Sequence, residues 1–370
     1  MGVCWARKAF ESLFMGSDYS GRGYSKVFGH SFRKPFFIGN AFIQRIKRLR
    51  SSSPADPHTN WRSQGLFYYP LSLYFRETFG APVRKISVDA GFSCPNVDGA
   101  VGRGGCIFCD NRSFSPSRRL NLPNIRDQIR EGIARMSAHY KSSKYIAYFQ
   151  PSTNTYAPAE KLERLYREAL AEPGIVGLAI GTRPDTLPND VLDLIADLSK
   201  ETWVCLEIGV QTACNASLDF LNRGHSFAAF TDAAARAEKR GIRLGAHFIL
   251  GIPGESHEEI IRTARLTAPL GLHSVKLHNL YVVANTPLAE LYAAGKISLI
   301  GREEYIRSVV DFLEMFPPGV VVERLAGDAP RDFLVAPFWS NDKGKVKQSV
   351  EEEFRRRGTF QGAKYTSEKF

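Results

Sequence analysis

Residues 85–109 read KISVDAGFSCPNVDGAVGRGGCIFC, and this stretch decides how the rest of the chain is interpreted. It begins with a β-branched run, Lys85–Ala90, of the kind that forms a buried strand. A glycine-rich loop follows and holds Cys94, Cys106 and Cys109 with the spacing C-x11-C-x2-C. Thiolates are soft ligands that favour zinc or iron–sulfur clusters, and glycines let the backbone pass close to such a centre. The stretch therefore predicts a strand followed by a metal-binding loop.

Beyond this loop, short apolar or aromatic runs alternate with longer segments of helical period. Including the first, the predicted strands are Lys85–Ala90, Tyr145–Gln150, Ile175–Gly181, Trp203–Gln211, Arg243–Gly251 and Ser274–Val283. Strands that alternate with helices form right-handed units of a parallel sheet. The sequence predicts an α/β fold, a partial (β/α)6 TIM-like barrel, with its site on the loops at the carboxyl ends of the strands.

The segments between these strands carry helix signals. Pro158 is suited to the start of one helix, and Ser256 with Glu259 forms the capping box of another. A further helix is predicted at Glu303–Phe316, followed by one more strand at Val320–Leu325. We interpret the chain after this strand as part of a small C-terminal accessory element packed on the barrel.

Length and composition favour a globular protein. The chain has 370 residues, of which 44% are apolar and 24% charged, enough to bury a large core. No apolar run reaches the roughly 18 residues of a membrane span, and the N-terminus lacks the continuous apolar core of a secretory signal. Six cysteines are too few for a disulfide scaffold in a chain of this size. We expect a cytoplasmic protein without a membrane partner.

The first sixty residues differ in character from the rest. They hold ten Lys and Arg and three Asp and Glu, a net charge of +7 out of +11, so only +4 belongs to residues 61–370. An organellar transit peptide, a basic arm for nucleic acid and an extension translated from an upstream start all fit this pattern. We favour the last, because a transit peptide forms a cleaner amphipathic helix. The predicted organisation is a disordered extension at 1–60, a barrel at 61–300 and an accessory region at 301–370.

Three clustered cysteines leave two kinds of metal site open. A structural zinc site normally needs four protein ligands, whereas three thiolates suit a four-iron cubane with one iron open to a small molecule. A fourth zinc ligand would come from Cys205, Cys214, His225 or His247. We favour the [4Fe-4S] cluster on Cys94, Cys106 and Cys109, and interpret Cys205 and Cys214 as core residues.

The cysteine loop resembles that of the radical S-adenosylmethionine (SAM) superfamily. Segments Ile86–Arg118 and Arg324–Pro330 resemble its bacterial YhcC-like branch, over about residues 65–370. Other segments resemble the radical subunit of the Elongator tRNA-modifying complex and, more distantly, oxygen-independent coproporphyrinogen oxidase. They are Gly181–Asp185, Glu207–Thr212 with Asn222–His225, and His247–Gly254.

The resemblance implies a cofactor pair and an electron donor. SAM would bind the open iron and be cleaved by an electron from the cluster, giving a 5′-deoxyadenosyl radical that abstracts hydrogen from the substrate. The donor would be a protein such as flavodoxin or ferredoxin. The residues at the family's SAM-binding positions are Phe108, Ser152, Thr153, Gln211, Arg223, His247 and Ile249.

Each of these positions has an implied role. Phe108 would pack beside the cluster and adenine, and Ile249 would line the adenine pocket. Ser152 and Thr153 would bind the amino group of the methionine part, and Gln211 and Arg223 would hold the ribose and carboxylate.

Two positions depart from the family pattern. Gly181 stands where both sets of relatives have Glu, and His247 where the oxidase relatives have Asp. The polar contacts to SAM should therefore differ. Further pocket candidates without an assigned role are Tyr156, Arg183, Asp185 and Glu207.

The sequence leaves the substrate open. Radical modification of tRNA is the second candidate, although a body charge of +4 gives it little electrostatic support. A candidate of another class is a zinc-stabilised nucleic-acid-binding protein that uses Arg45–Arg50 and Arg355–Arg357. Both basic runs are equally typical of a solvated helix face, and metal content would separate the enzyme from the binder.

Overall fold

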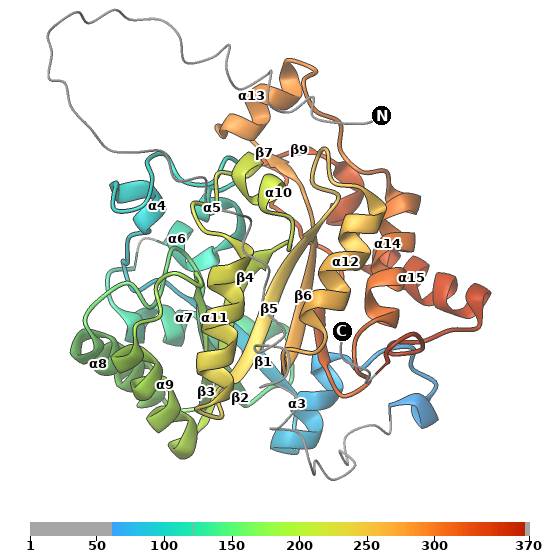
Figure 1. The fold of residues 1–370 in the computed structure, drawn as a ribbon. Coiled ribbons are helices and arrows are strands. Elements are labelled where there is room, and N and C mark those ends of the chain that lie inside the picture. Colours follow the sequence, from blue (N-terminus) through green and yellow to red (C-terminus); the bar gives the residue numbers. More distant parts are fainter. Residues whose placement is uncertain (1–60, 121, 367–370) are drawn as a thin grey trace, which may run out of the picture. The chain divides into compact units, whose positions relative to one another are not determined.

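Seven parallel strands form one curved sheet in the computed structural model, which describes residues 61–120 and 122–366 (Figure 1). In spatial order the strands are β1 (Val83–Val88), β2 (Lys144–Phe149), β3 (Ile175–Thr182), β4 (Trp203–Gln211), β5 (Arg243–Leu250), β6 (Ser274–Asn279) and β8 (Val321–Arg324). Each strand pairs in parallel with the next, so all carboxyl ends lie at one edge. The predicted α/β partial barrel is confirmed.

Helices occupy the connections between the strands, and α3 and α15 lie before the first strand and after the last. The longer ones are α3 (Leu71–Phe79), α7 (Ile125–His139), α8 (Ala159–Leu170), α9 (Asn189–Glu201), α11 (Phe227–Glu238), α12 (His257–Thr267), α14 (Arg302–Glu314) and α15 (Lys343–Arg357). The shorter ones are α4 (Pro95–Asp98), α5 (Asn111–Phe114), α6 (Pro116–Leu120), α10 (Asn215–Phe220) and α13 (Pro287–Ala293), with 3-10 turns at Arg62–Gln64 and Phe338–Asn341. The predicted capping box of Ser256 and Glu259 is present at the start of α12.

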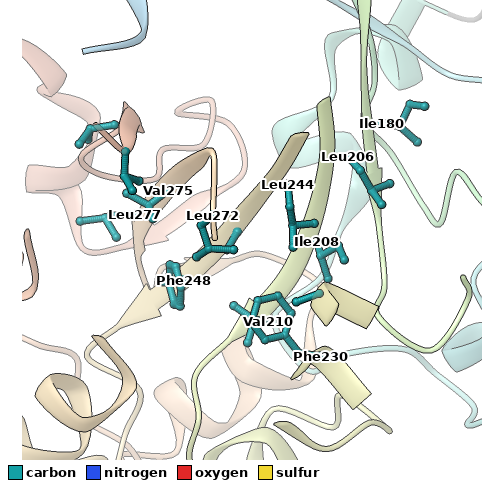
Figure 2. Packing of buried hydrophobic residues seen from close by; sticks show 14 of the residues in the cluster. Ile180, Leu206, Ile208, Val210, Phe230, Leu244, Phe248, Leu272, Val275 and Leu277 are labelled. Carbon is teal, nitrogen blue, oxygen red and sulfur yellow. The ribbon is translucent and has the colours of Figure 1, made fainter. Parts of the chain in front are cut away.

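The main apolar core lies between the sheet and these helices. Along β4, Leu206, Ile208 and Val210 face this core, and Phe230 of α11 and Phe248 of β5 lie in the same cluster (Figure 2). Successive side chains of a strand point to opposite faces, so the residues between these point into the barrel. The central strand β4 is buried on both faces, as is usual for parallel sheets.

A second apolar cluster closes the floor of the barrel. Inward residues at the beginnings of the strands, including Trp203 and Cys205 of β4, pack there against Trp61, Tyr74 and Phe75. The indole of Trp203 donates a hydrogen bond to the hydroxyl of Tyr74. The amino ends of the strands are therefore filled by side chains, and an interior site has to lie toward the carboxyl ends.

Two predicted strands differ from the structure. The run Ser274–Val283 divides into β6 and a short strand β7 (Val282–Val283), which pairs in antiparallel fashion with β9 (Leu334–Ala336) in a separate two-stranded sheet. The strand predicted at Val320–Leu325 is β8, which is hydrogen-bonded to β6 and so extends the barrel sheet. Both pairings join segments far apart in sequence, which local periodicity does not report.

The predicted N-terminal extension, residues 1–60 with the run Arg45–Arg50, lies outside the described residues. The division of the remainder at residue 300 stays a prediction. Among the described residues, no helix is long and apolar enough to cross a membrane.

Candidate functional site

One cavity of about 250 Å³ opens at the carboxyl ends of the strands. All ten residues predicted to bind the cluster or SAM line it: Cys94, Cys106, Phe108, Cys109, Ser152, Thr153, Gln211, Arg223, His247 and Ile249. They come from the loops after β1, β2 and β4 and from β4 and β5 themselves. The fold thus brings together residues that lie up to 155 positions apart in the sequence.

The cysteine loop is a series of tight turns. Cys94 precedes helix α4, whose first residue is Pro95. Cys109 donates its backbone N–H to the carbonyl of Cys106 at 3.0 Å, so these two thiols lie on one turn. The C-x2-C spacing predicted this arrangement.

Two asparagines tie the cysteine loop to the loop that follows α10. Asn96 is almost fully buried and donates through Nδ2 to the carbonyl of Asn222 at 2.5 Å and to Cys106 Sγ at 3.6 Å. In return, Asn222 Nδ2 donates to the carbonyl of Gly105 at 2.7 Å. Sequence reasoning missed both side chains, although they stand in the segments CPN and NRG on which the family resemblance rests.

This connection places the guanidinium of Arg223 against the cysteines. Nη1 donates to Cys106 Sγ at 3.2 Å, Nη2 to the carbonyl of Gly209 at 2.9 Å, and Nε to His225 Nε2 at 3.2 Å. Arg223 is only 7% exposed, so its guanidinium is not a solvated surface charge. The cation therefore lies directly beside a sulfur that would bind metal as a thiolate.

The backbone at the strand ends is held in an uncommon conformation. Ser152 and Gln211 have φ values of 63° and 67°, in the left-handed region that non-glycine residues rarely adopt. Within β4, two residues before Gln211, a Cβ on Gly209 would lie 2.6 Å from Gln211 Nε2 and 3.2 Å from Arg223 Nη2. Glycine is therefore needed at 209 for these two side chains to converge. Such conformations cluster at functional sites.

Three polar atoms on the cavity wall lack partners among the described residues, and Asn279 Nδ2 is one of them. Thr153 Oγ1 and Arg183 Nη1 are buried without a hydrogen bond, although both residues line the cavity. Leaving such a group unsatisfied costs about 1–3 kcal/mol. A polar ligand would satisfy them, and three thiols with a neighbouring cation are a donor set that fits an iron–sulfur cluster.

Below these residues lies a buried cluster of charged side chains. Glu207 of β4, fully buried, accepts hydrogen bonds from Lys85, from Lys276 at 3.0 Å and from His247 Nε2 at 2.7 Å. Lys85 also pairs with Glu323 of β8. Sequence reasoning gave Glu207 no role and missed both lysines. The available signal was a charged residue at an inward position of an otherwise apolar strand.

The cluster fixes the protonation of its members. Burial alone would raise the pKa of Glu207, but the ammonium groups of Lys276 and Lys85 and the hydrogen bond from His247 hold it well below its usual range. Burial and the charge of Lys276 lower the pKa of His247. His247 is therefore a neutral imidazole that donates from Nε2, because a carboxylate only accepts.

The candidates for a fourth zinc ligand are engaged elsewhere. Cys205 packs in the floor cluster, and Cys214 Sγ donates to Glu259 at 3.5 Å. His225 and His247 are hydrogen-bonded to Arg223 and Glu207 respectively. Within residues 61–120 and 122–366, no three His, Cys, Asp or Glu side chains converge as ligands of a single metal ion. A cubane does not require this, because each of its thiolates binds a different iron.

The remaining predicted residues have other partners or positions. Asp185 pairs with Arg183 at 2.8 Å, and Tyr156 lines a separate surface groove. In the basic tail, Arg356 pairs with Glu353, and Arg357 with Glu353 and Asp311. The tail run is thus a paired helix face, which weakens the nucleic-acid-binding alternative.

A parallel partial barrel with a cysteine-bearing loop after its first strand defines a barrel enzyme with its site at the carboxyl ends of the strands. The sequence matches the Radical SAM superfamily over residues 100–267 and the Radical_SAM C-terminal domain over residues 272–356. The chain belongs to the radical SAM superfamily and is an enzyme of that class, whose members characteristically bind SAM and an iron–sulfur cluster.

Relatives of similar length support this assignment. The uncharacterised protein YtqA of Bacillus subtilis is 36% identical over 306 residues, 83% of this chain and 94% of YtqA. Protein YhcC of Escherichia coli is 36% identical over 271 residues, 72% of this chain and 85% of YhcC. The solved structure of Elp3 from Methanocaldococcus infernus has the same fold, with a TM-score of 0.57 and 20% identity over 75% of this chain and 64% of that one. The predicted family and branch are confirmed.

Proposed function

We propose that this protein holds a [4Fe-4S] cluster on Cys94, Cys106 and Cys109 and cleaves SAM reductively to start a radical reaction. The observation that carries the proposal is the single cavity lined by all ten residues selected from the sequence. When bound, such a cluster supplies the electron that breaks a sulfonium C–S bond and releases the 5′-deoxyadenosyl radical.

The protein's own residues bind and orient. Arg223 stabilises the negative charge of Cys106, and Asn96 fixes the loop around it. Thr153 and Arg183 offer unpartnered polar atoms to the polar end of SAM. Phe108 and Ile249, which belong to one apolar cluster, provide a wall for the adenine.

The Glu207 cluster lies on the inner side of the same cavity, because Glu207, His247 and Lys276 also line it. Its ion pairs fix the inner wall that the substrate would meet. The hydrogen to be abstracted would lie between this wall and the cysteines.

Metal content and product formation test the proposal together. The full chain is reconstituted anaerobically with iron and sulfide, reduced with dithionite and supplied with SAM. We expect about four iron and four sulfide per chain and formation of 5′-deoxyadenosine in the wild type. Cys106→Ala should lose both.

Cys214→Ala is the matched control, since Cys214 does not line the cavity. It should retain iron and product. Uptake of zinc alone, a full cluster in Cys106→Ala, or a reducible cluster that forms no 5′-deoxyadenosine from SAM would each contradict the proposal.

The finer assignments follow from the same chemistry. The electron would come from a flavodoxin or ferredoxin in a reducing cytoplasm.

Modification of tRNA is the second candidate function, favoured by the Elp3 fold and by a cationic cleft at the side of the barrel. Mass analysis of nucleosides from tRNA incubated with the reduced holoenzyme and SAM tests it, and unchanged nucleosides would exclude it.

A further inference from the structure

Two cavities meet inside the barrel. A cleft of about 1250 Å³ is lined by residues of both edge strands, β1 and β8, so it lies where the partial barrel is open at the side. It shares Tyr148, Gln150, Lys276 and Arg324 with the cavity that holds the cysteines. The cleft is therefore a route by which a substrate reaches that cavity from the side.

The route is predominantly cationic. Seven Lys and Arg side chains line the cleft, against three Asp and Glu. Lys85 pairs with two glutamates and Lys276 with Glu207, whereas Lys343 and Arg324 share the single carboxylate of Asp328. The others leave a surplus of positive charge.

Arg324 carries this surplus to the junction of the two cavities. Its guanidinium makes no hydrogen bond to any described residue. Its nearest carboxylate, Asp328, lies 3.7 Å away and is already held by Lys343 at 2.8 Å. The Arg324 side chain is 33% exposed, so a ligand can reach it.

Two further donors line the same cavity as Arg324. Asn279 is 1% exposed and lines the inner cavity, and its Nδ2 has no partner among the residues described. Its Oδ1 accepts the backbone N–H of Gly327, which turns the amide's donor side away from that loop. The ammonium of Lys276 uses two of its three donors, on Tyr148 and Glu207.

The sequence brings these groups together through strand register. Lys276 of β6 lies opposite Arg324 of β8 in the sheet. The chain then turns closely past β6: a Cβ on Gly327 would lie 2.8 Å from His278 Nδ1 and 2.9 Å from the ring of Tyr281. The register of Arg324 and the close approach of Gly327 give a structural role to the segment RLAGDAP (residues 324–330), which contains none of the predicted SAM-binding residues.

His278, which lies beside this loop, adds no further positive charge. Burial and the charge of Arg324 hold the pKa of His278 well below its usual range, so the imidazole is neutral. An oxyanion is the ligand that matches several donors around a guanidinium whose carboxylate neighbour, Asp328, lies 3.7 Å away and is shared with Lys343.

We propose that Arg324 binds an oxyanion of the substrate, a carboxylate or a phosphate, which enters by the side cleft and is also contacted by Asn279 and Lys276. The assignment deepens the proposed function and rests on it, because it names the substrate class of the same cavity. Arg324 here anchors the substrate, and the carbon to be attacked lies beyond it toward the cysteines.

Calorimetric titration of the reconstituted full chain tests this without turnover. Inorganic phosphate and malonate are titrated separately, at low salt, in saturating SAM and without reductant. We expect the wild type to bind at least one of them, and the preferred anion to show whether the substrate carries a phosphate or a carboxylate. Arg324→Gln should weaken that binding at least tenfold, because bonds to charged groups are strong.

Two further variants make the test specific. Arg324→Lys keeps the charge but not the planar fork, so it should bind with intermediate affinity. Arg307→Gln, on the exposed face of α14, should bind as the wild type does. Thermal unfolding of each variant shows whether it is folded. If Arg324→Gln does not fold, the anion affinity of Arg324→Lys is compared with that of the wild type instead.

Binding of neither anion by the wild type, or equal binding by wild type and Arg324→Gln, overturns the assignment. Iron content and 5′-deoxyadenosine formation by the wild type report separately on the proposed function. A chain that loads iron and cleaves SAM but binds no anion at Arg324 would refute only this inference.

Discussion

Replacing Glu207 by Gln should cost the fold about 3 kcal/mol. The side chain is fully buried and accepts hydrogen bonds from Lys85, Lys276 and His247. Removing one partner of a buried ion pair costs about 3–5 kcal/mol, because the other charge stays buried without compensation. Lys85 retains Glu323, so the uncompensated charge is that of Lys276, and the lower end of the range applies.

Urea unfolding followed by tryptophan fluorescence measures this loss. A loss of about 3 kcal/mol is a large part of the 5–15 kcal/mol typical of a domain. Adding Lys276→Met to Glu207→Gln removes the stranded charge and should recover much of the loss. A single variant that loses less than about 1 kcal/mol, or a double variant no more stable than the single, would refute the reasoning.

The same variant has a defined pH dependence. Burial opposes ionisation of Glu207, but Lys276 and Lys85 outweigh it, so its pKa in the folded chain is lower than in the unfolded chain. Its stabilising contribution is complete above the unfolded pKa of about 4.3 and is lost as pH falls through the folded value. The difference between wild type and Glu207→Gln should therefore be constant from about pH 5 to 7 and shrink below about pH 4.

Three other substitutions test separate parts of the fold. Gly132→Ala adds a Cβ 2.4 Å from Ile86 Cγ2, so unfolding should show a net loss of about 1 kcal/mol despite better helix propensity. Burial raises the pKa of Glu255 to about 7, so between about pH 4.5 and 7 the folded chain holds a proton that the unfolded chain has lost. The free energy of unfolding of the wild type should therefore decline over this range, and the decline should vanish in Glu255→Gln. Tyr166→Phe removes a buried hydrogen bond to the carbonyl of Asn154 and should lower the free energy of unfolding by about 1 kcal/mol. The urea midpoint should fall accordingly, and an unchanged midpoint would contradict this.

Local signals explain what the sequence could predict. The run Trp203–Gln211 coincides with β4, and Arg243–Gly251 exceeds β5 by one residue, because each strand is a contiguous apolar run bounded by turn residues. The capping box of α12 was predictable because both partners lie within four positions. The cysteine spacing and the family motifs selected ten residues that share one cavity.

The charged cluster could not be predicted in the same way. Lys85, Glu207, His247 and Lys276 each stand at an inward position of a buried strand, which strand alternation shows. Which of them pair depends on register and shear across the sheet, since Lys85 and Glu207 are 122 positions apart. For the same reason the sequence placed β8 in an accessory region, although its Glu323 completes the cluster.

Charge balance explains why an anion site falls at Arg324 and not at Lys276. The two interior lysines are compensated by Glu207 and Glu323, which hold them by direct ion pairs. Arg324 adjoins Lys276 in register, but its carboxylate neighbour Asp328 lies 3.7 Å away and is shared with Lys343. A buried cation without a counter-charge is unfavourable, and partial exposure to the cleft lowers this cost. An incoming oxyanion would remove this cost, because its negative charge would neutralise the positive charge of Arg324 that the ion pairs of the barrel interior do not neutralise.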